Sequence, residues 1–173
     1  TAEMAIQAAL TGHLVLSTLH TNDAPSAITR LLDLGVPAYL INSTLLGVMA
    51  QRLVRTLCPH CKKAVTPREE QRAAWRSLVA PWKSAEPTQI WQPVGCLECR
   101  MTGYSGRVGV YEILVNSPEI RRMIKPLTEI PKLREQAFRE GMRPLRISGA
   151  LKVAQGITSL EEVIKVAPPS DDS

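Results

Sequence analysis

Apolar residues recur with a helical period at the start of the chain. Those within residues 2–9 are spaced at i, i+3, i+4 and i+7, so the sequence predicts a helix that Gly12 ends. Residues 13–19 then form a short run of Leu, Val and Thr, bounded by Gly12 and by a Thr-Asn-Asp sequence. Such a run is typical of a buried strand, and the succession of helix and strand indicates an α/β sheet.

The following stretch predicts two helices and a second strand. Asp23 can cap a helix whose apolar face continues until Gly35 stops it. Apolar positions within residues 41–49 mark a third helix. Residues 52–57 have the composition of a strand, and this strand leads directly into the first cysteine pair.

The middle of the chain predicts a helix and a strand on either side of a proline-rich stretch. Pro67 and the glutamates that follow it mark the start of a helix that continues through Leu78. Three prolines within residues 81–93 then interrupt regular structure. Residues 108–115 have the alternating pattern that is typical of a strand.

The last third of the chain is helical in pattern. Apolar side chains share one helix face within residues 130–138 and again within residues 147–154. Ser159 and Glu162 have the spacing of a capping box, so we expect the last helix to begin there. Residues 168–173, rich in Pro, Ser and Asp, are expected to form a disordered tail.

Composition narrows the class of protein without naming a function. The chain has 173 residues, of which 45% are hydrophobic and 4% aromatic, so aliphatic residues must build most of the core. Its net charge of +5 permits contact with phosphates or anionic lipid and requires neither. No apolar run approaches the roughly 20 residues that span a bilayer. The chain begins without Met inside a predicted helix, which predicts a piece of a longer protein.

All four cysteines lie in two Cys-x-x-Cys pairs, Cys58 with Cys61 and Cys96 with Cys99. Two such turns can direct four thiolates at one ion, so we expect a tetrathiolate zinc site. Two alternatives are less well supported. A redox site of the thioredoxin kind needs only one such pair, and two disulfides would suit a secreted chain, which nothing in this sequence indicates. Four protein ligands leave the ion no open position, so its role is structural. His60, inside the first pair, is expected to be exposed or to support the ligands.

Two histidines frame the first predicted strand, His13 before it and His20 after it. Taken alone, they are compatible with two hydrogen-bonded histidines at strand ends. Polar side chains crowd the carboxyl end of that strand, and this is the end at which α/β sheets bind ligands.

Several stretches, taken in order, resemble the hexameric motor ATPases of type II secretion and type IV pilus assembly. They are GHLVLSTLHTN, QRLVRTLCPHC, GCLECRMTGYSGRVGVYEILV and QGITSLEEVIKV. The resemblance covers nearly the whole chain and is weakest at residues 65–93. The first stretch resembles the His box of that family, and the cysteines resemble its tetracysteine module. Pilus-retraction relatives lack this module, so its presence favours a secretion or pilus-extension motor.

The resemblance implies a fold and a set of site residues. It implies the C-terminal part of a RecA-like core in 1–57, an inserted zinc module in 58–106, and a strand with a C-terminal helical subdomain in 107–167. His13 and His20 then belong to the His box, with His20 sensing the γ-phosphate as a neutral donor. Arg107 lies against the nucleotide, where a guanidinium can stack on the base or bind phosphate.

The resemblance also implies cofactors, partners and a location. The whole enzyme binds ATP and Mg²⁺, forms a homohexamer and engages inner-membrane platform and adaptor proteins at the cytoplasmic face of the bacterial inner membrane. The chain, however, lacks the family's Gly-rich loop ending in Gly-Lys-Ser/Thr, and the acidic Mg²⁺ motif would lie before Thr1. We therefore expect this polypeptide alone neither to bind ATP tightly nor to hydrolyse it.

Two other functions agree with parts of the sequence. A free-standing zinc ribbon could bind nucleic acid through five basic residues, Arg52, Arg55, Lys62, Lys63 and Arg100. No aromatic stacking platform interleaves with these charges, so no nucleic-acid partner is expected. A hydrolase that uses zinc with the two histidines fails, because the cysteines already saturate the ion.

Overall fold

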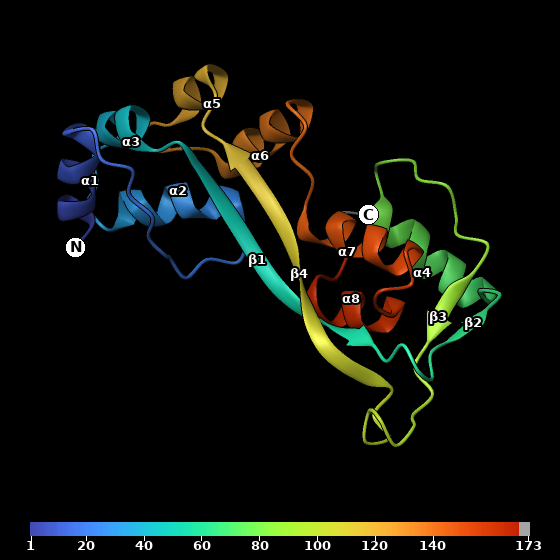
Figure 1. Cartoon of the computed structure of the whole chain (residues 1–173). Helices are drawn as coiled ribbons and strands as arrows, with labels where there is room; N and C mark the ends of the chain where they lie inside the picture. Colours follow the sequence, from blue (N-terminus) through green and yellow to red (C-terminus); the bar gives the residue numbers. More distant parts are fainter. Residues whose placement is uncertain (170–173) are drawn as a thin grey trace. The chain divides into compact units, whose positions relative to one another are not determined.

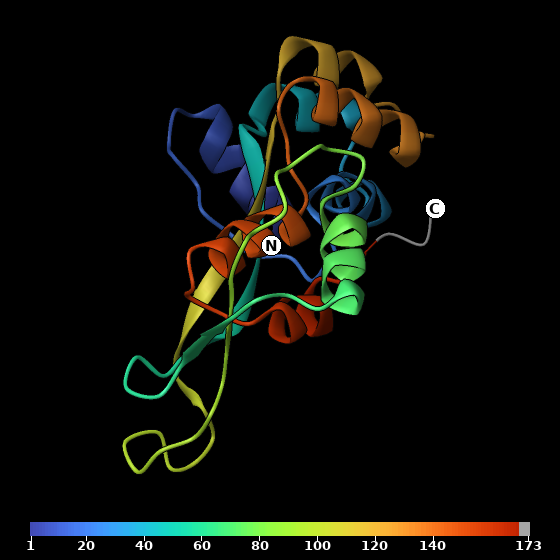
Figure 2. The same cartoon turned by 90° about the vertical axis from the view of Figure 1, so that its right-hand side faces the viewer.

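The computed structural model describes residues 1–169 and contains two compact units (Figures 1 and 2). Unit 1 comprises Thr1–Ala50 and Glu112–Arg143, and unit 2 comprises Gln51–Tyr111 with the chain from Pro144 onward. Helices and strands both occur, as the sequence pattern predicted. The predicted tail lies outside the described residues from residue 170 on.

Unit 1 is built mainly from five helices, which are α1 (Ala2–Leu10), α2 (Ala24–Asp33), α3 (Ala38–Thr44), α5 (Pro118–Met123) and α6 (Ile130–Arg139). Helix α2 packs against α3 and α6, and α5 also packs against α6. Fully buried aliphatic side chains, namely Ile28 of α2, Ile120 of α5 and Leu133 of α6, form its core. The amphipathic pattern predicted for α2 and α6 therefore marks the faces that meet in this unit.

Strands β1 (Gly47–Leu57) and β4 (Tyr104–Val115) pair in a two-stranded sheet. Each strand contributes residues to both units. The strands predicted at 52–57 and 108–115 are confirmed, and both are longer than predicted. The third helix was predicted through residue 49 but ends at Thr44, because residues 47–51 pair with β4 instead. Long-range pairing here overrides a local apolar period.

The strand predicted at residues 13–19 is not formed, and that prediction is wrong for this structure. Residues 13–20 are extended without ladder hydrogen bonds, and Leu14 and Leu16 are 74% and 88% exposed. A strand buried on both faces needs neighbours along its hydrogen-bonding edges. Within residues 1–169 no other strand pairs with this segment.

Unit 2 combines a small hairpin with three helices. Strand β2 (Lys63–Val65) pairs antiparallel with β3 (Ile90–Gln92), with Ala64 opposite Trp91. The helices are α4 (Glu69–Val79), α7 (Leu145–Ala154) and α8 (Leu160–Val166), and α7 packs against both of the others. A Cβ at Gly149 of α7 would lie 2.4 Å from Val163 of α8, so the absent side chain permits their close approach.

Helix α8 begins where the capping box predicted it. The Ser159 hydroxyl accepts a hydrogen bond from the Glu162 amide, which confirms the N-cap. The Glu162 carboxylate makes a different contact from the one predicted, because it accepts from the Arg55 backbone amide and side chain. Among the described residues, no helix is long and apolar enough to cross a membrane.

Candidate functional site: a tetracysteine cluster and a histidine segment

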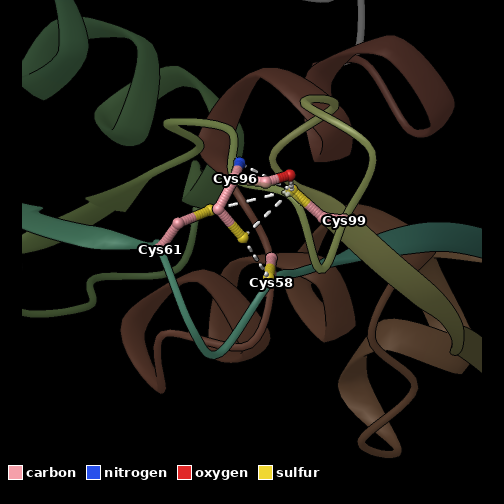
Figure 3. Close-up of side chains that lie close together, drawn as sticks. All are labelled: Cys58, Cys61, Cys96 and Cys99. Carbon is pink, nitrogen blue, oxygen red and sulfur yellow. Dashed lines mark hydrogen bonds between the residues drawn. The ribbon is translucent and has the colours of Figure 1, made fainter.

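Two tight loops of unit 2 carry the cysteines, and both lie side by side in Figure 2. Cys58 directly follows β1, and its carbonyl accepts a 3.0 Å hydrogen bond from Lys62 that closes the first loop around Cys61. In the second loop the Cys96 carbonyl accepts a 2.8 Å bond from the amide of Met101. Each loop is thus a closed turn that directs two sulfur atoms toward the other loop (Figure 3).

The four sulfur atoms have the spacing of a tetrahedral metal site. All lie within 4.8 Å of one another, and the closest pairs are 3.7 Å apart for Cys96 and Cys99 and 3.8 Å apart between the loops. Four thiolates at about 2.3 Å from one ion stand about 3.8 Å apart along each edge of the tetrahedron. A disulfide would need about 2.05 Å, and all four cysteines are free. The donor set therefore fits one soft divalent ion such as Zn²⁺.

Backbone amides donate hydrogen bonds to the sulfur atoms of two cysteines. Gly95 donates to Sγ of Cys61 at 3.3 Å, and Cys96 and Gly103 each donate to Sγ of Cys99 at 3.2 Å. Burial raises the pKa of the Cys99 thiol, but these two amides outweigh burial and the pKa falls to about 6. At Cys96 a backbone hydrogen bond lowers the pKa of the thiol, but burial and the neighbouring thiols outweigh it and raise the pKa to about 11. Without an ion, the loops therefore favour the thiolate at Cys99 and disfavour it at Cys96, and an ion that binds must displace the remaining protons.

Gly103 is expected to be needed for this geometry. Its φ is +80°, and a Cβ there would lie 2.4 Å from Cβ of Pro93. Gly103→Ala should therefore destabilise the chain by about 2–4 kcal/mol, through backbone strain and overpacking. Denaturant unfolding measures this, and metal affinity should fall with it. Gly141→Ala is the matched control, with φ +105° and no atom within 4 Å; equal losses of stability in the two variants would contradict the packing argument.

The first cysteine loop is fastened to the turn between α7 and α8. The Lys62 ammonium donates to the Gly156 carbonyl at 2.8 Å and lies 4.7 Å from the centre of the Trp91 ring. On the strand before the loop, the Arg55 guanidinium pairs with Glu162 at 2.7 Å and stacks 4.0 Å above the Tyr104 ring. The cysteine cluster is therefore part of the packing of unit 2.

The other predicted site residues are all exposed. His13 follows α1, with Nδ1 3.2 Å from the Thr11 hydroxyl. His20 lies at the end of the extended segment, and Arg107 lies on β4. Within residues 1–169 no hydrogen bond joins His13 to His20. His60 lies outside the group of candidate metal ligands. The structure thus gathers the cysteines, while the roles of His13, His20 and Arg107 stay predictions.

A cluster of contacts anchors the segment just after His20. The capping of α2 by Asp23 was predicted from the sequence and is confirmed, whereas the long-range contacts were not predicted. The Asp23 carboxylate accepts from the Ser26 amide at 2.9 Å and pairs with Arg134 of α6 at 2.5 Å. Burial raises the pKa of Asp23, but the bonds from Ser26 and Arg134 outweigh burial and lower it. Glu112 of β4 accepts from the Ala24 amide at 2.9 Å. For Glu112 the only local signal was a carboxylate at an inward position of the strand, between Val110 and Leu114.

Comparison with known proteins points to one family. Residues 1–165 match the family described as type II/IV secretion system protein. The type IV pilus assembly ATPase TfpB of Acinetobacter baylyi is 54% identical over 97% of this chain and 28% of its own length. The type II secretion system ATPase E of Vibrio cholerae is 46% identical over 98% of this chain and 33% of its own length.

A solved structure shows the same fold. The crystal structure of the pilus retraction motor PilT with bound ADP covers 99% of this chain with a TM-score of 0.59. The two are 23% identical, and the match spans 37% of that chain. The chain thus covers about a third of the length of the proteins that it matches.

Proposed function

This chain belongs to the type II/IV secretion system protein family, and from that premise we propose that it is the C-terminal part of a motor ATPase of type II secretion or type IV pilus assembly. The observation that carries the proposal is the match over residues 1–165, together with relatives named as ATPases at 46–54% identity. The chain contains no Gly-Lys-Ser/Thr loop. ATP and Mg²⁺ therefore bind in the longer protein, and this polypeptide alone is inactive.

Within that motor the chain supplies three modules. Residues 1–57 complete a RecA-like core, 58–106 form the metal module, and 107–167 add a strand and a C-terminal helical subdomain. The exposure of Leu14 and Leu16 supports the first assignment, because a strand at 13–19 would gain its neighbours from the rest of such a core. Six copies form a ring that engages inner-membrane platform and adaptor proteins from the cytoplasmic side.

The site residues take distinct roles. His20 donates a hydrogen bond from its imidazole ring to the γ-phosphate, and His13 lies in the same His box near the subunit contact. Arg107 is exposed on β4, where its guanidinium is free to reach the nucleotide. The four cysteines hold a structural Zn²⁺, which fixes the two loops and takes no part in hydrolysis.

The nucleic-acid alternative is less well supported. Arg55 is held by Glu162, and Lys62 is held by Gly156 and Trp91. Two of the five basic residues that would contact phosphate are therefore already bound to partners within unit 2. Arg52 also donates to the Gln51 carbonyl at 2.7 Å. Basic residues held in this way attract a nucleic-acid backbone less effectively than mobile ones.

The proposal is tested by His20→Ala in the full-length protein that contains this chain. Removal of one phosphate-directed donor should lower kcat for ATP hydrolysis about 100-fold with little change in KM. His60→Ala is the matched control, because His60 is an exposed histidine outside the metal ligands; its kcat should stay within about twofold of the wild type. Unchanged hydrolysis by the His20 variant would refute the role of His20.

A further inference from the structure

Glu112 is a buried carboxylate of unit 1 to which the proposed function assigns no role. Its side chain is 5% exposed, and Oε1 accepts a 2.9 Å hydrogen bond from the backbone amide of Ala24. Ala24 is fully buried and is the first residue of α2. A buried carboxylate is costly unless it is hydrogen-bonded or paired, so this contact fixes one particular backbone position.

A second long-range contact fixes the preceding residue. Asp23 is the N-cap of α2, and its Oδ2 pairs at 2.5 Å with the guanidinium of Arg134, 111 residues away on α6. Its other oxygen accepts from the Ser26 amide at 2.9 Å. The Thr21 hydroxyl donates to the Asp23 carbonyl at 3.0 Å, which extends the anchored stretch to within one residue of His20.

Within this chain the segment before the anchor has little support of its own. Residues 13–20 are extended, and seven of the eight are exposed. In the longer protein, the strand proposed at 13–19 holds the chain before His20, and the anchored backbone at residues 21–24 holds it after His20. A hydrogen-bond donor displaced by about 1 Å from a reacting phosphate can cost a hundredfold in rate.

We propose that Glu112 and Arg134 are positioning residues for His20, which hold the backbone at residues 21–24 so that the imidazole reaches the transferred phosphate. This inference rests on the proposed function of His20. It assigns a functional consequence to two side chains, on β4 and α6, that do not touch the nucleotide themselves. Through the pair of Arg134 and Asp23, a movement of α6 would also change the position of His20.

The anchor itself is tested in the 173-residue chain by amide exchange and by histidine NMR signals. Arg134→Met should shift or broaden the His20 ring signal and leave those of His13 and His60 in place. Glu112→Met should speed exchange of the Ala24 amide at least tenfold, whereas Glu112→Gln keeps an acceptor oxygen and should restore slow exchange. Arg139→Met is the control, on the same helix but paired with Glu135 at the surface; it should change neither signal.

The functional consequence is tested by a double-mutant cycle in the full-length protein. Arg134→Met should lower kcat about tenfold with KM unchanged, and Arg139→Met should not lower it. In the His20→Ala background the same Arg134 substitution should lower kcat by less than about twofold, because it acts through a side chain that is already absent.

The outcomes separate this inference from the function on which it rests. If the His20→Ala enzyme has a normal kcat, His20 has no role in hydrolysis and the inference fails with it. If His20→Ala is slow but Arg134→Met lowers kcat equally in both backgrounds, only the inference fails, since Arg134 then acts independently. An Ala24 amide whose exchange is the same in Glu112→Met and the wild type also overturns it.

Discussion

Cys96→Ser should abolish stoichiometric metal binding and lower the thermal unfolding midpoint of the chain by about 10 °C. Cys96 is half-buried, so the substitution itself removes little packing and the loss comes from the metal. With free metal 1,000-fold above its Kd, binding to the folded state alone contributes about 4 kcal/mol. For a chain of this size, about 4 kcal/mol corresponds to roughly 10 °C. Scanning calorimetry with and without a chelator measures it.

The controls separate loss of metal from loss of a side chain. Leu97→Ser changes the adjacent residue, which is 90% exposed and offers no ligand, and should leave the midpoint within about 1 °C of the wild type. A chelator should lower the midpoint of the wild type to that of Cys96→Ser and leave the variant unchanged. If the chelator has no effect on the wild type, the metal site contributes nothing to stability.

Glu162→Ala should destabilise the chain by about 2 kcal/mol. The carboxylate is buried and accepts from the Arg55 amide at 2.9 Å and from its Nε at 2.8 Å. Removal of the carboxylate leaves the Arg55 amide without an acceptor and breaks the ion pair with the guanidinium. The Arg55 side chain is 49% exposed. Solvent screening of that half-exposed partner keeps the cost below that of a fully buried pair. Urea unfolding at neutral pH measures it.

The same contact makes stability depend on pH. Burial raises the pKa of Glu162, but the hydrogen bonds and charge of Arg55 outweigh burial and hold it below its ordinary value. Its contribution is therefore full above the unfolded pKa of about 4.3 and is lost as the pH falls through the folded pKa. Glu161→Ala, the exposed neighbour on α8, should show neither effect. If the stabilities of Glu162→Ala and of the wild type fall in parallel below pH 4.5, Glu162 contributes nothing to the pH dependence.

Local patterns predicted those features whose cause is local. The cysteine spacing predicted one cluster, and the structure brings all four sulfurs together. Helix α4 and the N-cap of α8 were also predicted, because Pro67 and Ser159 act on their own neighbouring backbone. In each case the residues that determine the element lie within or next to it.

The failures have a long-range cause. The apolar run at 41–49 was read as one helix, although pairing with β4 ends it at residue 44. The strand at 13–19 lacks a neighbour within residues 1–169. The contacts of Glu112 with Ala24 and of Arg134 with Asp23 join residues 88 and 111 positions apart. No periodicity within either segment identifies such partners.

Native mass spectrometry of the purified chain tests the central claim most directly. We expect one bound zinc ion per polypeptide, with four cysteines that resist alkylation until the ion is removed. Cys96→Ser, analysed beside it, should carry no ion. A metal-free wild type whose mass shows its thiols joined in disulfides would contradict the tetrathiolate site and the packing of unit 2 built on it.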